Sequence, residues 1–232
     1  MKKIKSISIM FPLYKDRRTV KYMIFKSIKL MKKMRKTYEI IMVDDGCPEK
    51  SGIYAQELTK KKNVKVIFHK KNLGYGAAIK TGIKHCKYNW IFQTDGDAEY
   101  DVNDLKKLVK YSKYSDLIIT FRLKKKYKTS RVIISWVYNF ILRVLFSTTF
   151  KDISTGSRLI NKKIMNKIKL FSNSPFIGAE LAIKSRNKDV KVSEVGIHTY
   201  PRTFGSGSSV SLKNIFLTIK DMLKLYFKIG KI

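Results

Sequence analysis

The stretch QTDGDAEYD, residues 93–101, places acidic side chains at alternate positions: Asp95, Asp97, Glu99 and Asp101. In an extended segment alternate side chains project from the same face, so we expect these carboxylates to point the same way. The chain has 50 Lys and Arg against 17 Asp and Glu, a formal net charge of +33, and acids on such a chain would otherwise pair with neighbouring lysines. Their clustering indicates a bound cation. Mg²⁺ or Mn²⁺, held by one to three carboxylates and completed by substrate phosphates, fits this pattern; the alternative is a strand end with solvated acids.

Other metal sites fit the sequence less well. A calcium-binding EF-hand loop would need Gly at its sixth position and Glu at its twelfth, where this chain has Tyr100 and Lys106. Cys47 and Cys86 form no CxxC pair and no cluster with histidine, so we expect neither a zinc site nor a disulfide framework. The default location is therefore a reducing compartment.

Two further stretches contain candidate site residues. Asp44 and Asp45 precede Gly46, a place where acids that cap or form a turn are as common as functional acids. The stretch NLGYGAAIKTG, residues 72–82, is rich in glycine like a phosphate-binding loop, yet it matches neither GxGxxG nor GxxxxGK[ST]. Its small residues favour close packing of a helix, with Asn72 as a capping or turn residue.

Short runs rich in Ile, Val and aromatic residues alternate with segments of helical length. We expect strands at 4–11, 38–45, 64–69, 88–95 and 116–121, and helices near 17–34, 51–61, 74–87 and 102–113. This alternation predicts an α/β fold with a mostly parallel central sheet and helices on both faces. Ligands bind at the carboxyl ends of the strands in such sheets, and the stretches PLYKD, DDG and DGDAE lie there.

The composition limits the class of protein. With 232 residues, 44% hydrophobic and 12% aromatic, the chain can bury one core, and we expect one domain with a tail. The positive excess indicates an anionic partner, either nucleic acid, a phospholipid surface or a phosphorylated substrate, unless it reflects a general bias towards Lys and Ile. A nucleic-acid-binding function leaves the acid cluster unexplained, and the chain lacks a known recognition module. We therefore expect no nucleic-acid partner.

Two later segments have helical patterns. In 131–146, Arg131, Ser135, Asn139 and Arg143 form a narrow polar stripe on an otherwise apolar helix, whose broad apolar face belongs in a core or a bilayer. Residues 212–229 form a basic amphipathic helix, which suits a membrane interface or packing on the sheet. No run reaches 18 apolar residues, and the N-terminal apolar run reads as a strand rather than a signal peptide. We predict a peripheral protein on the cytoplasmic face of an anionic membrane.

Several motifs occur together in an order that resembles one family. They are Asp45 after an apolar strand, NLGYGAAIKTG, the Asp95-x-Asp97 pair, DISTGSR (152–158) and RTFGSGS (202–208). In order and approximate spacing they resemble family 2 glycosyltransferases with the GT-A fold. More narrowly, they look like the dolichol-phosphate mannose synthase and polyprenyl-phosphate glycosyltransferase branch. The resemblance runs from about residue 7 to 210. It implies a catalytic domain over 1–210 followed by the helix in 211–232.

The resemblance implies a donor site for a nucleotide diphosphate sugar, either GDP-mannose or a UDP-hexose. Asp95 and Asp97 match the aspartates that hold the metal and the diphosphate, and Glu99 matches a further ligand. Such a metal makes the diphosphate a better leaving group. Asp101 matches no family role, and we expect it to cap a helix from Val102. The nucleotide is expected to contact the residues that match the rest of the donor site: Pro12, Tyr14, Asp16, Asp45, Asp95 and Gly96.

The resemblance also implies an acceptor, a polyprenyl or dolichyl phosphate. Its oxygen is already anionic, so it can attack the anomeric carbon of the sugar without a protein base. Three arginines match phosphate-binding positions and suit a bidentate grip on phosphate: Arg122, Arg131 and Arg202. We expect the acceptor side to include Asp152, Arg158, Glu180 and Ser206. In RTFGSGS this chain has Gly207 and Ser208 where the branch has Ser and Lys. The rival interpretation is a relative that glycosylates a sugar hydroxyl with Glu180 as base, and a separate membrane-anchoring partner protein is compatible with either.

Overall fold

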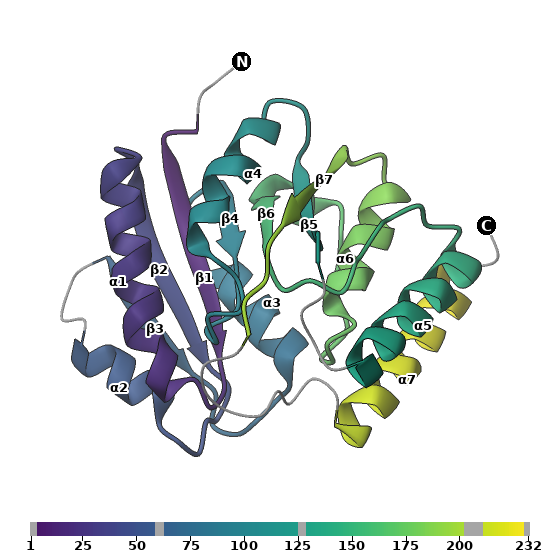
Figure 1. The fold of residues 1–232 in the computed structure, drawn as a ribbon, viewed down its shortest axis with the longest axis horizontal. Coiled ribbons are helices and arrows are strands. Elements are labelled where there is room, and N and C mark those ends of the chain that lie inside the picture. Colours follow the sequence, from purple (N-terminus) through teal and green to yellow (C-terminus); the bar gives the residue numbers. More distant parts are fainter. Residues whose placement is uncertain (1–3, 59–62, 125–128, 202–210, 230–232) are drawn as a thin grey trace.

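The computed structural model describes residues 4–58, 63–124, 129–201 and 211–229 (Figure 1). Strands and helices alternate along most of the described chain, as the sequence predicts. The strands are β1 (Ser6–Leu13), β2 (Thr37–Asp44), β3 (Val64–Phe68), β4 (Trp90–Gln93), β5 (Leu117–Arg122), β6 (Arg158–Asn161) and β7 (Val192–Ile197). The helices are α1 (Arg17–Lys33), α2 (Ser51–Leu58), α3 (Tyr75–His85), η1 (Val102–Asp104), α4 (Leu105–Tyr111), α5 (Thr129–Phe146), η2 (Lys162–Asn166), α6 (Ile177–Arg186) and α7 (Leu212–Ile229).

The strands form one sheet in the order β3-β2-β1-β4-β6-β5-β7. Every pairing is parallel except the two made by β6, which runs antiparallel to β4 and to β5. The mostly parallel α/β sheet predicted from the sequence is therefore confirmed. Because β1, β2 and β4 run in parallel, their carboxyl ends meet at one edge, where the acid-rich stretches follow them.

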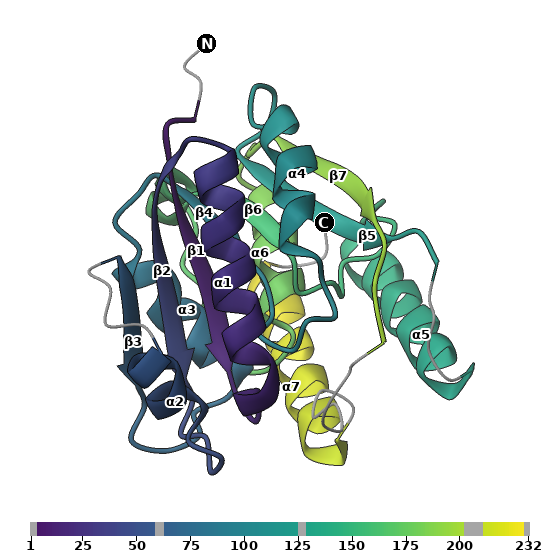
Figure 2. The same ribbon diagram turned by 60° about the vertical axis from the view of Figure 1, so that its left-hand side comes forward.

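Helices cover both faces of the sheet (Figures 1 and 2). Alternate residues of β1 point to opposite faces, so Ile9 and Phe11 pack with α1, α2 and α4, while Met10 packs with α3, α5, α6 and α7. Close packing explains the small residues of α3, since a Cβ on Gly82 would lie 2.6 Å from the side chain of Met10. Asn72 does not cap this helix; the N-cap is Gly74, with φ of 101°.

The acid-rich stretch is not extended, which corrects the first expectation. Strand β4 ends at Gln93, and the chain turns through Ala98, whose φ is 62°. The alternation of side chains along an extended strand is therefore not what positions these carboxylates. Asp101 has the predicted capping role, because its side chain accepts a hydrogen bond of 2.8 Å from the backbone N–H of Asn103 at the start of η1.

The C-terminal part packs onto the same core as the rest. Met222 and Leu225 of α7 are buried beside Leu142 and Phe146 of α5. Both predicted helices are present with nearly the expected bounds. Among the described helices, none combines the length and the apolar character needed to cross a bilayer. Arg202 and Ser206 lie outside the described residues, and so does the side chain of Arg131.

Candidate active site

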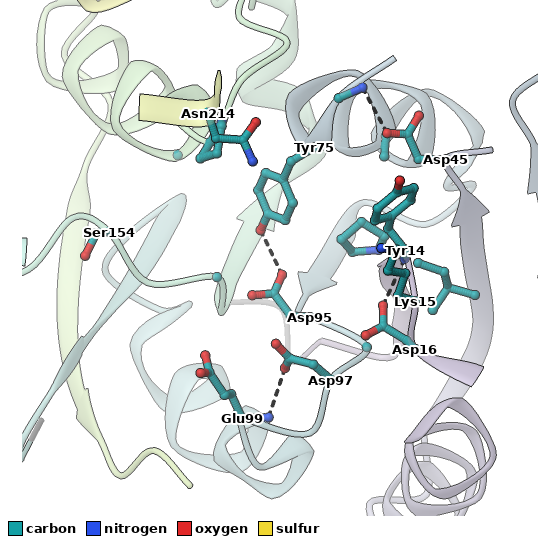
Figure 3. A pocket seen from close by; sticks show the side chains of 18 of the residues that line it. Tyr14, Lys15, Asp16, Asp45, Tyr75, Asp95, Asp97, Glu99, Ser154 and Asn214 are labelled. Carbon is teal, nitrogen blue, oxygen red and sulfur yellow. Dashed lines mark hydrogen bonds between the residues drawn. The ribbon is translucent and has the colours of Figure 1, made fainter. Parts of the chain in front are cut away.

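A cavity of about 580 Å³ opens at the carboxyl ends of β1, β2 and β4 (Figure 3). Its first half is lined by the segments that follow these strands and by the start of α3. Its second half comes from the end of β5, the loop before β6, the start of α6 and the start of α7. All of the residues predicted for the donor and its metal line it: Pro12, Tyr14, Asp16, Asp45, Asp95, Gly96, Asp97 and Glu99. The fold thus gathers residues that are up to 87 positions apart in the chain, from Pro12 to Glu99.

Asp95 is held in place from two directions. Tyr75, at the start of α3, donates a hydrogen bond of 2.8 Å from its hydroxyl to Asp95 Oδ1 (Figure 3). On another side the backbone of Gly156 comes so close that a Cβ there would lie 2.0 Å from Asp95 Oδ2. Gln93 donates to both Tyr75 Oη and the carbonyl of Gly156, at 3.2 Å each. The sequence did not identify Tyr75, although it stands inside the glycine-rich stretch.

Two buried tyrosines beside this carboxylate stay protonated. Burial and the charge of Asp95 raise the pKa of Tyr75 well above its usual range. Burial likewise raises the pKa of Tyr100, whose hydroxyl accepts a hydrogen bond of 3.0 Å from the backbone N–H of Gly156. Both phenols therefore remain neutral at physiological pH, and Tyr75 remains a donor to Asp95.

Asp97 and Glu99 lie in the turn that follows Asp95. Both are buried, and Asp97 Oδ1 accepts a hydrogen bond of 2.9 Å from the backbone N–H of Glu99 (Figure 3). Within the described part of the chain, no three His, Cys, Asp or Glu side chains are grouped closely enough to hold a metal ion. Two oxygen-donor side chains at a pocket suit Mg²⁺ or Mn²⁺ only when substrate oxygens complete the coordination. The predicted ligand set of Asp95, Asp97 and Glu99 remains a prediction.

The loop after β1 brings Tyr14 and Asp16 to the pocket in a bent conformation. Asp16 Oδ2 accepts a hydrogen bond of 2.9 Å from the backbone N–H of Tyr14, across Lys15 with φ of 64°. Gly96 fits tightly behind this loop, because a Cβ there would lie 2.8 Å from the side chain of Leu13. A side chain at position 96 would therefore displace the loop that lines this side of the cavity.

The adjacent aspartates at the end of β2 have different roles. Asp44 accepts hydrogen bonds from the backbone N–H groups of Cys47 and Gly52, at 2.7 and 2.6 Å, so it fixes the turn and the start of α2. Asp45 faces the pocket and accepts hydrogen bonds of 2.9 Å from the N–H groups of Leu73 and Gly74. Asp44 therefore has a structural role, whereas Asp45 lies at the cavity. The sequence alone did not distinguish the two roles.

His69, which the sequence analysis did not single out, contacts Asp45 from outside the lining of the cavity. It follows β3, and its Nδ1 lies 2.7 Å from Asp45 Oδ1, while its Nε2 lies 2.9 Å from Thr81 Oγ1. Oδ1 of Asp45 therefore has two partners, His69 and the N–H of Leu73, and Oδ2 has one, the N–H of Gly74. A carboxylate has about four acceptor positions, so about one of them remains for a ligand.

Arg122 and Asp152, both predicted on the acceptor side, are paired with each other. Arg122 Nε and Nη2 donate to the Asp152 carboxylate at 2.7 and 3.1 Å. Asn139, from the polar stripe of α5, binds the same carboxylate at 3.4 Å and accepts from the N–H of Ile153 at 3.1 Å. This network ties α5 to the loop before β6. Arg122 lines the pocket, but part of its guanidinium is already engaged by Asp152.

Arg158 is a buried cation at the wall of the pocket. It is 3% exposed, and its Nη2 donates to the carbonyl of Thr155, while its Nε has no hydrogen-bond partner among the described residues. A Cβ on Gly178 would lie 2.5 Å from Nη2. Glycine at this position thus makes room for the guanidinium at the start of α6.

Glu180 lies outside the lining of the pocket, contrary to the expectation that it belongs to the acceptor side. It is fully buried, accepts hydrogen bonds from the N–H groups of Phe171 and Ser172, and forms an ion pair of 2.6 Å with Lys184. A carboxylate engaged in this way anchors the segment before α6. Its position gives no support to its role as a base.

Comparison with known proteins agrees with this geometry. The model of the family described as Glycosyl transferase family 2 matches residues 8–169. An undecaprenyl-phosphate 4-deoxy-4-formamido-L-arabinose transferase of Pectobacterium atrosepticum is 23% identical over 218 residues, which cover 92% of this chain and 65% of that protein. A dolichyl-phosphate beta-glucosyltransferase of Trichomonas vaginalis is 22% identical, over 94% of this chain and 72% of the other. The chain thus spans slightly less than two thirds of the first relative.

A solved structure has the same fold. Glucosyl-3-phosphoglycerate synthase from Mycobacterium tuberculosis, in complex with Mn²⁺, uridine diphosphate and phosphoglyceric acid, superposes with a TM-score of 0.74. The alignment covers 96% of this chain and 78% of the other, at 14% identity. The GT-A fold predicted from the sequence is therefore confirmed.

Proposed function

Because the chain belongs to glycosyl transferase family 2, we propose that it moves a sugar from a nucleotide diphosphate sugar to a polyprenyl or dolichyl phosphate. The names of the undecaprenyl-phosphate and dolichyl-phosphate relatives support this class of acceptor. The observation that carries the proposal is the distribution of charge around the cavity. Among the described lining residues, acids occur only up to Glu99, while the later ones include the cations Arg122, Arg158 and Lys213 and no carboxylate.

This distribution suits a phosphate acceptor better than a hydroxyl. A hydroxyl must lose a proton as it attacks, and this is the task of a nearby carboxylate or histidine. A phosphate oxygen is already anionic and needs cations that hold it. Among the described residues, the second half of the cavity, which we call the acceptor half, offers cations. Glu180 is paired with Lys184 outside the cavity. We therefore prefer the lipid phosphate to the rival sugar hydroxyl.

The proposed reaction is a single displacement with inversion. An oxygen of the lipid phosphate attacks the anomeric carbon and forms the new C–O bond, while the bond from that carbon to the diphosphate oxygen breaks. The nucleoside diphosphate leaves with the bonding electrons. Mg²⁺ or Mn²⁺, when bound by Asp95 and Asp97, would neutralise charge on this leaving group. Arg122 and Arg158 are proposed to orient the attacking phosphate, and Arg131 and Arg202 remain further candidates.

The geometry around Asp45 favours uracil as the base of the donor. About one acceptor position of Asp45 is free, and uracil presents a single ring N–H. Guanine presents a ring N–H beside an amino group, a pair of donors that a carboxylate binds best with two free positions. We therefore propose a UDP-sugar rather than GDP-mannose as donor.

The proposal includes a peripheral position on the cytoplasmic face of a membrane. Cys47 and Cys86 are both free thiols, a state that a reducing compartment maintains. The need for a separate membrane-anchoring partner remains a prediction.

A donor panel tests the proposal. Purified protein with Mn²⁺ or Mg²⁺ is given undecaprenyl or dolichyl phosphate in detergent and one radiolabelled UDP-sugar or GDP-mannose at a time. We expect label in the lipid extract with one UDP-sugar, and none with metal removed by a chelator. Slow donor hydrolysis with no lipid product would retain the donor site but contradict the acceptor.

A further inference from the structure

Helix α5 exposes an apolar face instead of a polar one. Six large apolar side chains along it are exposed, each between 41% and 64% accessible: Ile133, Ile134, Trp136, Val137, Phe140 and Val144. Arg143 near the end of the helix is also exposed. The polar residue Asn139 is turned inwards to Asp152. A helix packed on a water-soluble core normally has the opposite arrangement, with charged residues outside. The sequence suggested that this broad apolar face lies in the core or in a bilayer. Because the core does not cover it, a bilayer remains as its environment.

Helix α7 has two apolar sectors. One contains Met222 and Leu225 and is buried against the core. The other lies within an arc of about 80° around the helix axis and is exposed. It consists of Leu212, Phe216, Ile219, Leu223 and Phe227, which are 43% to 87% accessible. Packing on the sheet explains the first sector and leaves the second without a role.

The charges on α7 indicate what covers the exposed sector. Lys213, Lys220, Lys224 and Lys228 are all exposed, and by helical spacing they lie along one flank of the apolar stripe. The acid of this helix, Asp221, is turned inwards, with Oδ2 accepting from Ser172 Oγ at 2.6 Å. An apolar stripe bordered by lysines is the pattern of a helix that lies in the headgroup region of a bilayer. Anionic headgroups complement the lysines.

The two helices lie on the same side of the sheet (Figures 1 and 2). They touch near their carboxyl ends, where Phe146 and Tyr226 pack edge to face with ring centres 6.2 Å apart. The start of α7 also lines the cavity, through Ser211, Lys213, Asn214 and Leu217. The helix that carries the exposed apolar sector therefore also lines the second half of the cavity, with a neighbouring part of its surface.

We propose that α5 and α7 form a membrane-docking surface, made of their exposed apolar side chains and the lysines of α7, that binds anionic phospholipid bilayers. A second copy of the chain is a poorer occupant, since two surfaces on a chain of net charge +33 repel each other. Docking brings the mouth of the cavity to the bilayer, where a lipid phosphate is accessible. The inference extends the proposed function, but it rests on these two helices and can be tested without any sugar donor.

Vesicle sedimentation tests the docking surface. We expect the wild-type protein to bind vesicles of phosphatidylcholine containing about one third phosphatidylglycerol at least tenfold more tightly than phosphatidylcholine alone. The double variant Phe216→Ser with Phe227→Ser should lose about tenfold or more of this binding. The matched control is Tyr22→Ser with Phe25→Ser, which removes exposed aromatics from α1 and should bind as the wild type does.

Trp136 gives a second measurement that does not depend on removing apolar side chains. The chain has two tryptophans, Trp90 and Trp136, and Trp136 is 62% exposed on α5. In a Trp90→Phe variant, brominated lipid in the anionic vesicles should quench the remaining fluorescence. Absence of quenching, or equal binding by the α7 variant and the wild type, would overturn the proposal. So would a stable dimer that the same α7 substitutions dissociate, because a second copy would then cover the surface.

Discussion

Tyr75 donates a hydrogen bond of 2.8 Å to Asp95 Oδ1, and this contact links the start of α3 to the turn that follows β4. The same carboxylate is confined by Gly156 on another side. The side chain of Asp95 is thus confined to one orientation in the pocket. A carboxylate that is fixed before the substrate arrives loses little freedom when it binds a metal and a diphosphate, which is the advantage of a preorganised site.

Removing the hydroxyl of Tyr75 should weaken catalysis more than stability. In Tyr75→Phe, Asp95 loses a hydrogen bond to a charged acceptor, which is worth about 1.5–3 kcal/mol, so we expect kcat/KM to fall roughly ten- to a hundredfold. The metal concentration for half-maximal activity should rise, as measured by titration with Mn²⁺. An unchanged metal requirement in this variant would contradict the positioning role of Tyr75.

Adding one methyl group at Gly156 should lower the rate of the reaction roughly a hundredfold. The Cβ of Gly156→Ala would lie 2.0 Å from Asp95 Oδ2, so the carboxylate must move, and a shift of about 1 Å can cost roughly a hundredfold in rate. The matched control is Gly196→Ala in β7, where the Cβ would lie 2.6 Å from the exposed Leu123 side chain and 3.1 Å from the ring of Phe121. Steady-state rates for the two variants check this prediction, and equal rates would disprove the tight fit at Asp95.

Glu180→Gln should destabilise the fold and leave turnover largely intact. The substitution replaces a fully buried carboxylate that is paired with Lys184 and accepts hydrogen bonds from Phe171 and Ser172. We expect a loss of about 2 kcal/mol, which lowers Tm by about 4–8 °C in a chain of this size. Thermal unfolding and the initial rate at a temperature where the variant is folded check both parts.

The rival interpretation predicts the reverse for this variant. With Glu180 as the base for a hydroxyl acceptor, Glu180→Gln would abolish turnover while the protein stays folded. A folded but inactive variant would therefore favour the sugar hydroxyl and count against the lipid phosphate.

UDP should bind more tightly than GDP. About one acceptor position remains on Asp45, so we expect a difference in Kd of at least about tenfold in calorimetry with Mn²⁺ present. His69→Ala removes one partner of Asp45 Oδ1 and frees a second position. The preference for UDP should then shrink. Tighter binding of GDP by the wild type would refute the assignment of the base.

The sequence predicted the first half of the fold well, and it predicted that the acid-rich stretches meet at one edge of the sheet. Strands β1 to β5 and the intervening helices are dominated by local hydrophobic patterns, and their bounds lie within a few residues of the expected ones. The order of the acid-rich stretches after β1, β2 and β4 was sufficient to bring Asp16, Asp45 and Asp95 to one pocket. Parallel strands make this inference possible, because their carboxyl ends share one edge.

The second half depends on contacts that no local pattern reveals. Strand β6 has four residues, runs against its neighbours and begins with the buried Arg158, so it does not resemble a strand in sequence. The pairing of Arg122 with Asp152 and the burial of Glu180 arise from segments that meet only in the folded chain. The contact of His69 with Asp45 likewise joins residues 24 positions apart.

The most direct test compares two acceptors that differ only in the phosphate. Undecaprenyl phosphate and undecaprenol are offered separately in the same detergent, with the active UDP-sugar and Mn²⁺, and sugar incorporation into lipid is counted. We expect label with the phosphate, none with the alcohol, and none with either in Asp95→Asn. Incorporation into undecaprenol at a comparable rate would contradict a phosphate acceptor, and label transfer by a folded Asp95→Asn variant would contradict the donor site.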